Sequence, residues 1–250
     1  MPRPTRVLAV LALLGAALLL PGMPVRAQEK LPVEAIERIV RDYLLRQPEV
    51  IYQAIQELQK RQQAEEASRQ KATITRHKDE IFHQAEDPVA GDQNGKVTLV
   101  EFFDYHCGYC RAMSPSLRKM LDGDKELRFV FKELPVLGPD SVTAAKAALA
   151  AAKLDAKKYP SLHFALMQSR DLSRDAVLEI AARQGYDRGQ LGAEMEQDWV
   201  KARIDANLAL ADKLGISGTP SFVIGETLIP GAVDVAQLQR LIQEQREASN

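Results

Sequence analysis

Apolar side chains recur at helical spacing over residues 33–58, and they form two separate stripes. The first stripe consists of Val33, Ile36, Val40 and Tyr43, and the second of Ile51, Ile55 and Leu58. Pro48 separates the stripes and disfavours helical geometry at Gln47, so the pattern predicts two short helices joined by a corner. Little neighbouring chain covers either stripe. The helices therefore either dock onto the rest of the molecule or associate with copies of themselves.

The next segment, residues 59–80, is dominated by Gln, Lys, Arg and Glu, and its few apolar side chains are Ala64, Ala67, Ala72 and Ile74. A segment of this composition has no apolar face to bury, so it forms either a solvated helix or a mobile linker. We expect a polar linker over residues 59–84.

From residue 85 onward the pattern predicts a mixture of strands and helices. The run Lys96–Phe103 is almost wholly apolar, which is typical of a parallel strand covered on both faces. The other expected elements are a helix over 109–121, a strand over 127–131, a helical block over 141–214, a loop over 215–220, short strands over 221–224 and 227–229, and a helix over 235–247. This order predicts an α/β sheet with one long helical insertion, at about 139–214.

Residues 1–27 have the organisation of a secretory signal peptide. Arg3 and Arg6 precede an apolar run from Val7 to Leu20, and Val25-Arg26-Ala27 offers small residues at the cleavage positions. The run is shorter than the roughly 20 residues that a membrane helix needs. We expect cleavage of this leader and export of the mature chain, with an uncleaved anchor as the alternative.

The nearly balanced charge of the chain excludes a function in nucleic-acid binding. The chain has 33 basic and 34 acidic side chains, and removal of Arg3, Arg6 and Arg26 with the leader leaves 30 against 34. Such a balance gives no basic face for nucleic acid.

A mature chain of about 220 residues buries a core without disulfide bonds or metal ions to stabilise it, so one domain with appendages is expected.

Cys107 and Cys110 are the only cysteines of the chain, and Gly108-Tyr109 separates them. Exported proteins usually place cysteines in structural disulfides. A disulfide within this tetrapeptide would close too short a loop to constrain the unfolded chain. The pair therefore performs chemistry or binds a ligand.

The predicted junction of strand and helix at the cysteines favours thiol chemistry. A helix N-terminus presents unsatisfied N–H groups and a partial positive charge, which stabilise a thiolate at Cys107. Cys110, one turn inside the helix, is shielded and can attack a mixed disulfide formed at Cys107.

Metal binding is the main alternative at this pair. One Cys-x-x-Cys is half of a zinc site, and no histidine completes it at finger spacing; the four are His77, His83, His106 and His163. Arg111 stands where haem attachment needs His. Two thiolates suffice for Cu(I), so a Cu(I)-binding envelope protein stays open, as does a structural envelope protein with a vestigial redox site.

The run Glu101-Phe102-Phe103-Asp104-Tyr105-His106-Cys107-Gly108-Tyr109-Cys110, with Thr219-Pro220 about 110 residues later, resembles the DsbA-like branch of the thioredoxin superfamily. The resemblance covers residues 85–250. It implies a thioredoxin fold with an inserted helical domain and a cis proline at Pro220.

Two further resemblances are more specific. Gly108-Tyr109 and Thr219 are the pairing seen in DsbC-type disulfide isomerases rather than in strong oxidases. Residues 39–58, with Arg41-Asp42-Tyr43-Leu44-Leu45 and Pro48-Glu49-Val50, are similar to the N-terminal segment of suppressor-of-copper-sensitivity C proteins. Some members of that group trimerise through this segment. The resemblance therefore implies that residues 28–58 are an oligomerisation segment and that the protein is a homo-oligomer, with a trimer as the expected form.

The resemblance also implies roles for individual residues. Cys107 matches the nucleophile and Cys110 the resolving thiol. Glu101 matches a buried acid that shuttles a proton for Cys110, although a structural ion pair with Lys132 or Arg128 is an alternative. His106 lies outside the matched pattern, either as a neighbour that tunes Cys107 or as an exposed loop residue.

Substrate-binding roles fall on the segments beside the cysteines. Thr219 and Pro220 match the cis-proline loop, which pairs with an extended substrate, and Gly108 and Tyr109 lie next to it. The resemblance implies a periplasmic thiol–disulfide oxidoreductase that acts on envelope proteins. It favours isomerase or reductase activity over oxidation, with a membrane redox partner and no organic cofactor or metal.

Overall fold

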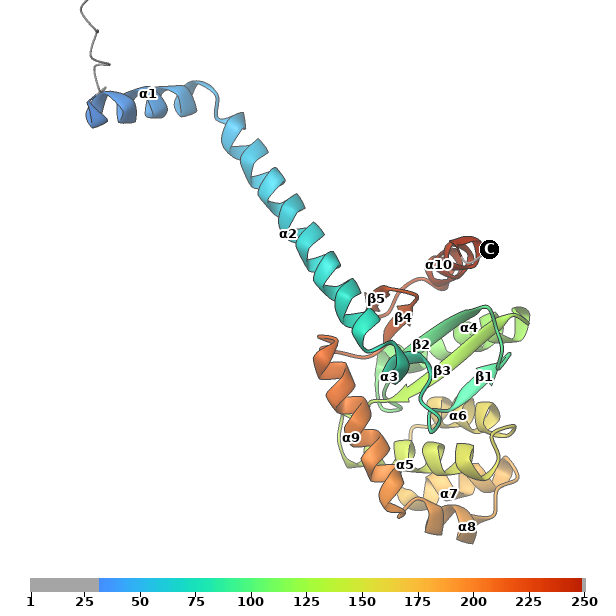
Figure 1. The fold of residues 1–250 in the computed structure, drawn as a ribbon. Helices are drawn as coiled ribbons and strands as arrows, with labels where there is room; N and C mark the ends of the chain where they lie inside the picture. Colours follow the sequence, from blue (N-terminus) through green and yellow to red (C-terminus); the bar gives the residue numbers. More distant parts are fainter. Residues whose placement is uncertain (1–31, 249–250) are drawn as a thin grey trace, which may run out of the picture. The chain divides into compact units, whose positions relative to one another are not determined.

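The structure is a computed structural model that describes residues 32–248, and the chain divides into two compact units after Leu58 (Figure 1). The expected signal peptide, residues 1–27, lies outside the described residues. Within the described part of the chain, no helix combines the length and apolar character that crossing a membrane requires.

The N-terminal stripes lie on two helices, α1 (Val33–Arg46) and α2 (Glu49–Arg76). The predicted corner at Pro48 is confirmed, because the two helices are separated by Gln47 and Pro48. The prediction that the second helix is short is wrong: α2 has 28 residues and continues through the polar segment. The sequence explains this length, since no Gly or Pro occurs between Glu49 and Arg76 and good helix formers dominate.

The apolar stripes of α1 and of the first part of α2 are exposed in the single chain. Their exposed large side chains are Val33, Ile36, Val40, Tyr43, Ile51, Ile55 and Leu58. None of the residues of α1 is buried.

The last turns of α2 contribute to the core of the second unit. Ile74 is buried, as is Ile81 of the short helix α3 (Lys78–Phe82). Lys71 forms an ion pair with Glu226 at 2.5 Å, and the Thr75 hydroxyl donates to the same carboxylate at 3.2 Å. The polar composition of residues 59–80 did not predict these buried and bonded positions.

A five-stranded sheet lies at the centre of the second unit, in the order β1-β3-β2-β4-β5. Its strands are β1 (Val89–Gly91), β2 (Val97–Phe103), β3 (Leu127–Glu133), β4 (Ser221–Ile224) and β5 (Thr227–Pro230). β2 and β3 are parallel and the other pairs are antiparallel. The apolar run predicted β2, whereas β1 was missed because it has three residues and is defined by its pairing with β3.

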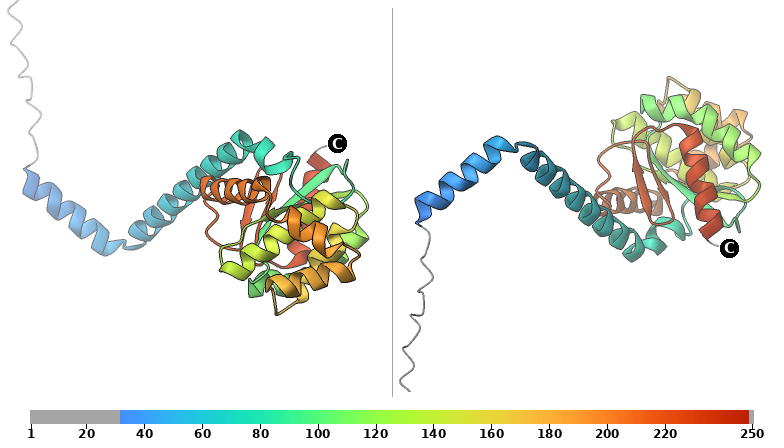
Figure 2. Two further views of the ribbon diagram at one scale, coloured as in Figure 1. Left: turned by 90° about the horizontal axis from the view of Figure 1, so that it is seen from below. Right: turned by 90° about the horizontal axis from the view of Figure 1, so that it is seen from above.

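Helices cover both faces of the sheet (Figure 2). On one face, α4 (Gly108–Gly123) and α10 (Val235–Ala248) pack against Leu99 and Phe129. On the other face, α3 and the end of α9 (Asp198–Lys213) pack against Val100 and Val130. This two-sided coverage explains why β2 and β3 are apolar at nearly every position.

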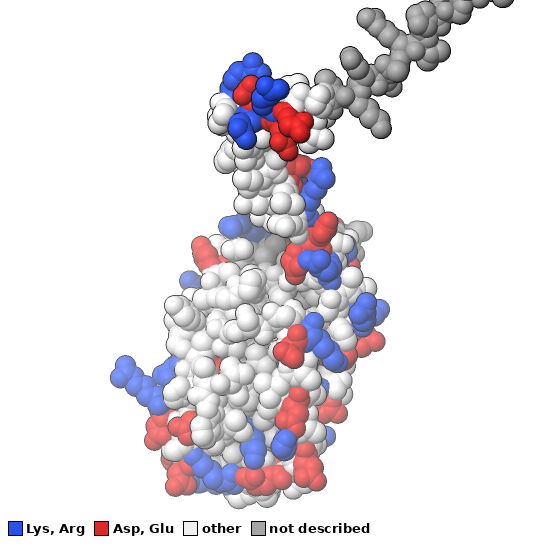
Figure 3. Space-filling model, turned by 90° about the vertical axis from the view of Figure 1, so that its left-hand side faces the viewer, with Lys and Arg blue, Asp and Glu red and all other residues white. Residues whose placement is uncertain are grey.

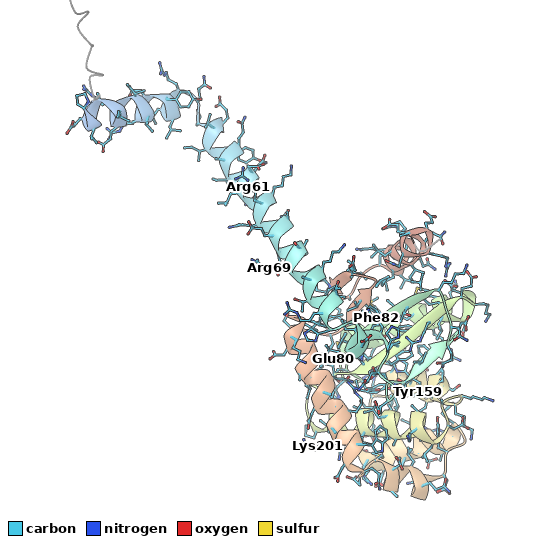
Figure 4. The ribbon with its side chains drawn as sticks, viewed as in Figure 1. Arg61, Arg69, Glu80, Phe82, Tyr159 and Lys201 are labelled. Carbon is cyan, nitrogen blue, oxygen red and sulfur yellow. The ribbon has the colours of Figure 1, made fainter. Side chains whose placement is uncertain are left out.

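The predicted helical insertion is confirmed between β3 and β4. It consists of α5 (Pro139–Leu154), α6 (Tyr159–Gln168), α7 (Arg174–Arg183), α8 (Arg188–Glu194) and α9. α5 lies at its centre and buries six alanines: Ala144, Ala145, Ala147, Ala148, Ala150 and Ala151. Small side chains let its neighbours approach closely. Tyr159, the first residue of α6, packs its ring against Phe131 of the sheet (Figure 4).

A buried ion pair joins the sheet to the segment that precedes it. Lys132 bonds to the Asp87 carboxylate and donates to the Glu80 carbonyl oxygen at 2.5 Å. Arg203 of α9 approaches the same carboxylate at 3.5 Å. Figure 4 shows Glu80 and Phe82 beside the sheet, where the Phe82 carbonyl oxygen accepts a hydrogen bond from Arg128 at 2.8 Å.

Candidate active site

Cys107 lies where β2 leads into α4, as the sequence predicted. It is the N-cap residue of α4, with φ −70° and ψ 121°. Its N–H donates to the Asp104 carbonyl oxygen at 3.1 Å, and its own carbonyl oxygen accepts the Arg111 N–H at 3.0 Å. Cys110 is in the first turn of the helix and is fully buried. Both cysteines are free thiols.

The loop before β4 contacts the first of these thiols. The Thr219–Pro220 peptide bond is cis. The Cys107 Sγ donates to the Thr219 carbonyl oxygen at 3.2 Å. The antiparallel pairing of β2 with β4, in which Phe102 lies opposite Ser221, brings the loop to this position. Two segments 112 residues apart in the chain thus form one site.

Glu101 lies on the middle strand of the same site and is buried. It pairs with Phe131 of β3 and Phe222 of β4, so apolar strands flank it on both sides. Burial, and next the proximity of Cys107, raise the pKa of Glu101 to about 8. Its Oε1 has no hydrogen-bond partner among the described residues.

The alternative of a structural ion pair at Glu101 does not match the structure. Lys132 bonds to Asp87 and to the Glu80 carbonyl oxygen, and Arg128 donates to Phe82. A carboxyl group without a compensating cation in an apolar environment prefers its neutral form. Glu101 is therefore a group that can accept and release a proton near neutral pH.

The same environment acts on Cys110. Burial, and next the charge of Glu101, raise the pKa of Cys110 well above that of an ordinary thiol. Its thiol is therefore protonated at neutral pH, and it needs a base before it can act as a nucleophile. Glu101 is the carboxyl group whose charge acts on this thiol.

A hollow of about 500 Å³ lies beside the two active-site segments. It is lined by Tyr109, by residues 215–219, and by Ser221, Leu228, Pro230, Gly231 and Ala232. Tyr109 is 70% exposed at its edge. Of the residues expected to bind substrate, Tyr109 and Thr219 line the hollow, whereas Gly108 and Pro220 do not.

The lining of the hollow contains no Lys, Arg, Asp or Glu. Val136 and Leu137 are 52% and 50% exposed on the loop before α5. Figure 3 shows a face of the molecule with a wide area almost free of Lys, Arg, Asp and Glu. Surfaces of this kind favour contact with apolar, uncharged segments of another chain.

His106 was expected either to tune Cys107 or to be an exposed loop residue. The structure places it as an exposed residue of the turn before α4. Only its backbone N–H takes part in the site, by donating to the Asp104 carboxylate at 2.7 Å. Within residues 32–248, no three His, Cys, Asp or Glu side chains are grouped so that they could hold a metal ion.

Sequence reasoning missed Asp104, which is buried directly after β2. Its carboxylate accepts hydrogen bonds from the backbone of His106, Val136 and Leu137 and from the Ser141 hydroxyl. An acidic residue next to an apolar strand was the available signal, but three of its four partners, Val136, Leu137 and Ser141, lie more than 30 residues away in the sequence.

A buried polar cluster at the interface of sheet and insertion was also missed. The Tyr105 hydroxyl donates to Glu133 at 3.2 Å and lies 3.0 Å from His163 Nδ1. Burial raises the pKa of Glu133 well above its usual range and lowers that of His163 to about 3. Both groups are therefore neutral, and they hold Tyr105, two residues before Cys107, by hydrogen bonds between neutral partners.

The fold and this dithiol site are those of the thiol–disulfide oxidoreductases. Residues 98–243 match the DSBA-like thioredoxin domain family, and the chain belongs to that family. Residues 33–65 match a second family, the copper resistance protein ScsC N-terminal domain.

Solved structures of three proteins illustrate the likeness. A thioredoxin-like oxidoreductase from Silicibacter pomeroyi DSS-3 is 43% identical and covers 68% of this chain and 97% of its own, with a TM-score of 0.64. A linker-deletion variant of ScsC from Proteus mirabilis is 29% identical over 89% of this chain and 100% of its own, with a TM-score of 0.67. A periplasmic thioredoxin-like protein from Salmonella enterica serovar Typhimurium is 32% identical over 68% and 95%, with a TM-score of 0.62.

Some of the curated relatives are much longer proteins. The chain spans about a quarter (26%) of the length of the Na⁺/H⁺ antiporter NhaA from Herminiimonas arsenicoxydans, to which it is 29% identical over 65% of its own length.

Proposed function

We propose that the protein catalyses dithiol–disulfide exchange on other proteins, with Cys107 as nucleophile and Cys110 as resolving thiol. The contact between Cys107 Sγ and the Thr219 carbonyl oxygen carries this proposal. It places the more accessible thiol next to a backbone group that an extended client can bind, while Cys110 is shielded behind it.

The reaction begins when the Cys107 thiolate attacks one sulfur of a client disulfide. The client S–S bond breaks, one client sulfur leaves as a thiolate, and a mixed disulfide joins Cys107 to the other. Cys110 then gives its proton to Glu101 and attacks the Cys107 sulfur. The second client sulfur leaves, so the client gains two electrons and the protein is left with a Cys107–Cys110 disulfide.

Isomerisation uses the same first step. If a thiol of the client attacks the mixed disulfide before Cys110 does, a different client disulfide forms and Cys107 is released unchanged. The high pKa of Cys110 slows its attack and lengthens the time available for this rearrangement. This delay supports isomerase activity, and the likeness of Gly108-Tyr109 and Thr219 to disulfide isomerases is our ground for favouring isomerase or reductase activity over oxidation.

Clients bind through their backbone and their apolar side chains. An extended client segment pairs with the Thr219 backbone, as an added strand does, and the hollow beside Tyr109 accepts an apolar side chain. Misfolded envelope proteins expose such segments. Export through the N-terminal leader places the protein with these clients in the periplasm, where a membrane partner supplies electrons to keep the pair reduced.

The N-terminal unit assembles the protein into a homo-oligomer, which we propose to be a trimer. Its two helices expose apolar stripes, and a hollow on α1 is lined by Ile36, Val40, Leu44 and Leu45. Burying these stripes against copies of themselves removes them from water. Several active sites on one assembly raise the local concentration of thiols around one client.

The proposal can be tested with insulin as the client. A small dithiol supplies the electrons, and the turbidity of the precipitating insulin chains measures the rate of reduction. The wild-type protein should accelerate precipitation, Cys107→Ser should abolish the acceleration, and Cys110→Ser should leave mixed disulfides with insulin. Ser114→Ala, one turn further along α4, is a matched control and should keep the wild-type rate. Full activity in Cys107→Ser would overturn the assignment of roles.

A further inference from the structure

Asp104 lies at the junction of the active-site turn and the helical insertion. It is 1% exposed. Its Oδ1 accepts hydrogen bonds from the His106 N–H and the Ser141 hydroxyl, both at 2.7 Å. Its Oδ2 accepts from the N–H groups of Val136 and Leu137, at 2.8 and 3.0 Å. Four neutral donors from three stretches of the chain thus occupy both oxygens of one carboxylate.

The backbone of Asp104 contacts the cysteines themselves. Its carbonyl oxygen accepts the Cys107 N–H at 3.1 Å. Its backbone also acts on Cys110, where it lowers the pKa of the thiol against the larger effect of burial. One residue therefore acts on both members of the redox pair through its backbone and on the insertion through its side chain.

We propose that Asp104 is a positioning residue for the redox pair: its carboxylate fixes the turn that places Cys107 at the N-terminus of α4, and it fastens that turn to the start of α5. This inference rests on the proposed exchange function, which supplies the reaction whose geometry Asp104 sets. Small displacements of reacting atoms reduce rates strongly, so the rigidity of this turn matters for the attack at Cys107.

The arrangement of donors explains why an amide cannot replace the carboxylate. In Asp104→Asn, one oxygen becomes an NH₂ group, which cannot accept a hydrogen bond. The N–H groups of Val136 and Leu137 cannot reverse, so the remaining oxygen stays with them. The NH₂ group then faces Ser141, whose hydroxyl can turn and accept, and the His106 N–H, which loses its acceptor. The turn before Cys107 is therefore the part that this substitution releases.

Amide hydrogen exchange on the full mature protein tests, without reference to activity, whether the Asp104 carboxylate holds these backbone N–H groups. The amides of His106, Val136 and Leu137 should exchange about 100-fold more slowly than unbonded loop amides, although they belong to a surface loop and turn. In Asp104→Asn the His106 amide should lose at least about tenfold of this protection, while Val136 and Leu137 keep theirs. Unprotected amides in the wild-type protein would overturn the proposal even if the variant does not fold.

Steady-state disulfide exchange tests the consequence for the reaction. Asp104→Asn should lower kcat about tenfold and change KM less than twofold, because Thr219 and the hollow that bind the client are untouched. Asp124→Asn is the matched control: Asp124 accepts the Glu126 N–H at 3.1 Å at the other end of α4. It should change kcat less than twofold.

The outcomes separate this inference from the proposed function. Equal losses of kcat in Asp104→Asn and Asp124→Asn would reduce Asp104 to a general stabilising role and overturn the inference. An unchanged kcat despite loss of His106 protection would overturn it as well. A wild-type protein without disulfide-exchange activity would contradict the proposed function. The amide hydrogen exchange of His106, Val136 and Leu137 would still decide whether the Asp104 carboxylate holds the turn.

Discussion

The Cys107 thiol donates a hydrogen bond to the Thr219 carbonyl oxygen at 3.2 Å. This bond exists only while the thiol carries its proton, because a thiolate has no hydrogen to donate and is repelled by the carbonyl oxygen. Ionisation of Cys107 therefore frees the Thr219 oxygen. In the proposed mechanism a client backbone N–H then takes the place of the thiol, which would link activation of the nucleophile to binding of the client at one atom.

The rate of the resolving step should depend on Glu101. Because the pKa of Glu101 is raised to about 8, its carboxylate becomes available as a base as pH rises through that value. In the wild-type protein, decay of the mixed disulfide should therefore accelerate between about pH 7 and 9. Glu101→Gln should slow it by roughly 100-fold or more and remove the inflection. Stopped-flow measurement of client release gives both results, and an unchanged pH profile in the variant would exclude Glu101 as the base.

Glu101 should also make the stability of the reduced protein depend on pH. Its folded pKa of about 8 lies above the ordinary value of 4.5, so the folded state holds its proton more tightly than the unfolded state. The free energy of unfolding of the wild-type protein should therefore fall, relative to that of Glu101→Gln, as pH rises from about 4.5 to 8. The difference should reach on the order of 5 kcal/mol above pH 8 and vanish below pH 4. Urea denaturation of the reduced forms at several pH values measures it, and a difference independent of pH would contradict the burial of an unpaired carboxyl.

The positions of β2 to β5 and of the helix start at the cysteine pair were predictable because they depend on local sequence, whereas β1 depends on its pairing with β3. The apolar run of β2 and the Cys-x-x-Cys that follows it indicate a covered strand and a helix start without knowledge of any partner. The length of α2 was not predictable, since its polar residues are compatible with a helix or with a coil. The acceptor role of Asp104 and the pairing of Lys132 with Asp87 arise from contacts between distant segments, which leave no periodic signal in the sequence.

Breaking the buried pair of Lys132 and Asp87 should destabilise the second unit. Lys132→Met leaves the Asp87 carboxylate buried without its main cation, and we expect a loss of about 3–5 kcal/mol in the free energy of unfolding. Lys146→Met, which removes one of the two cationic partners of the more exposed Glu196, should cost less than about 1 kcal/mol. Equal losses in urea denaturation would show that the buried pair contributes no more than a surface pair.

The apolar stripe of α1 should control the oligomeric state. Val40→Asp places a charge on the exposed stripe and should yield monomers, whereas Arg38→Asp on the opposite side of the helix should leave the assembly intact. Light scattering at micromolar concentration measures both, and a monomeric wild-type protein would remove the oligomer proposal.

A truncated chain that begins at Gln59 tests the purpose of the assembly. It keeps Ile74 and Ile81, which belong to the core of the second unit. It should be monomeric and reduce insulin normally, but it should lose reactivation of scrambled ribonuclease. A truncated chain that isomerises as well as the full protein would separate assembly from isomerase activity.

The most direct test of the exchange mechanism is to identify the sulfur that first bonds to a client. A short peptide carrying a mixed disulfide with a chromogenic thiol is incubated with the reduced wild-type protein and both single Cys→Ser variants. The reaction is quenched with acid, and the adducts are located by mass spectrometry. If Cys107 is the nucleophile, the peptide is attached to Cys107 in Cys110→Ser, and Cys107→Ser forms no adduct at the buried Cys110. The wild-type protein then passes through the Cys107 adduct to an intramolecular disulfide. A peptide attached first to Cys110 would contradict this assignment.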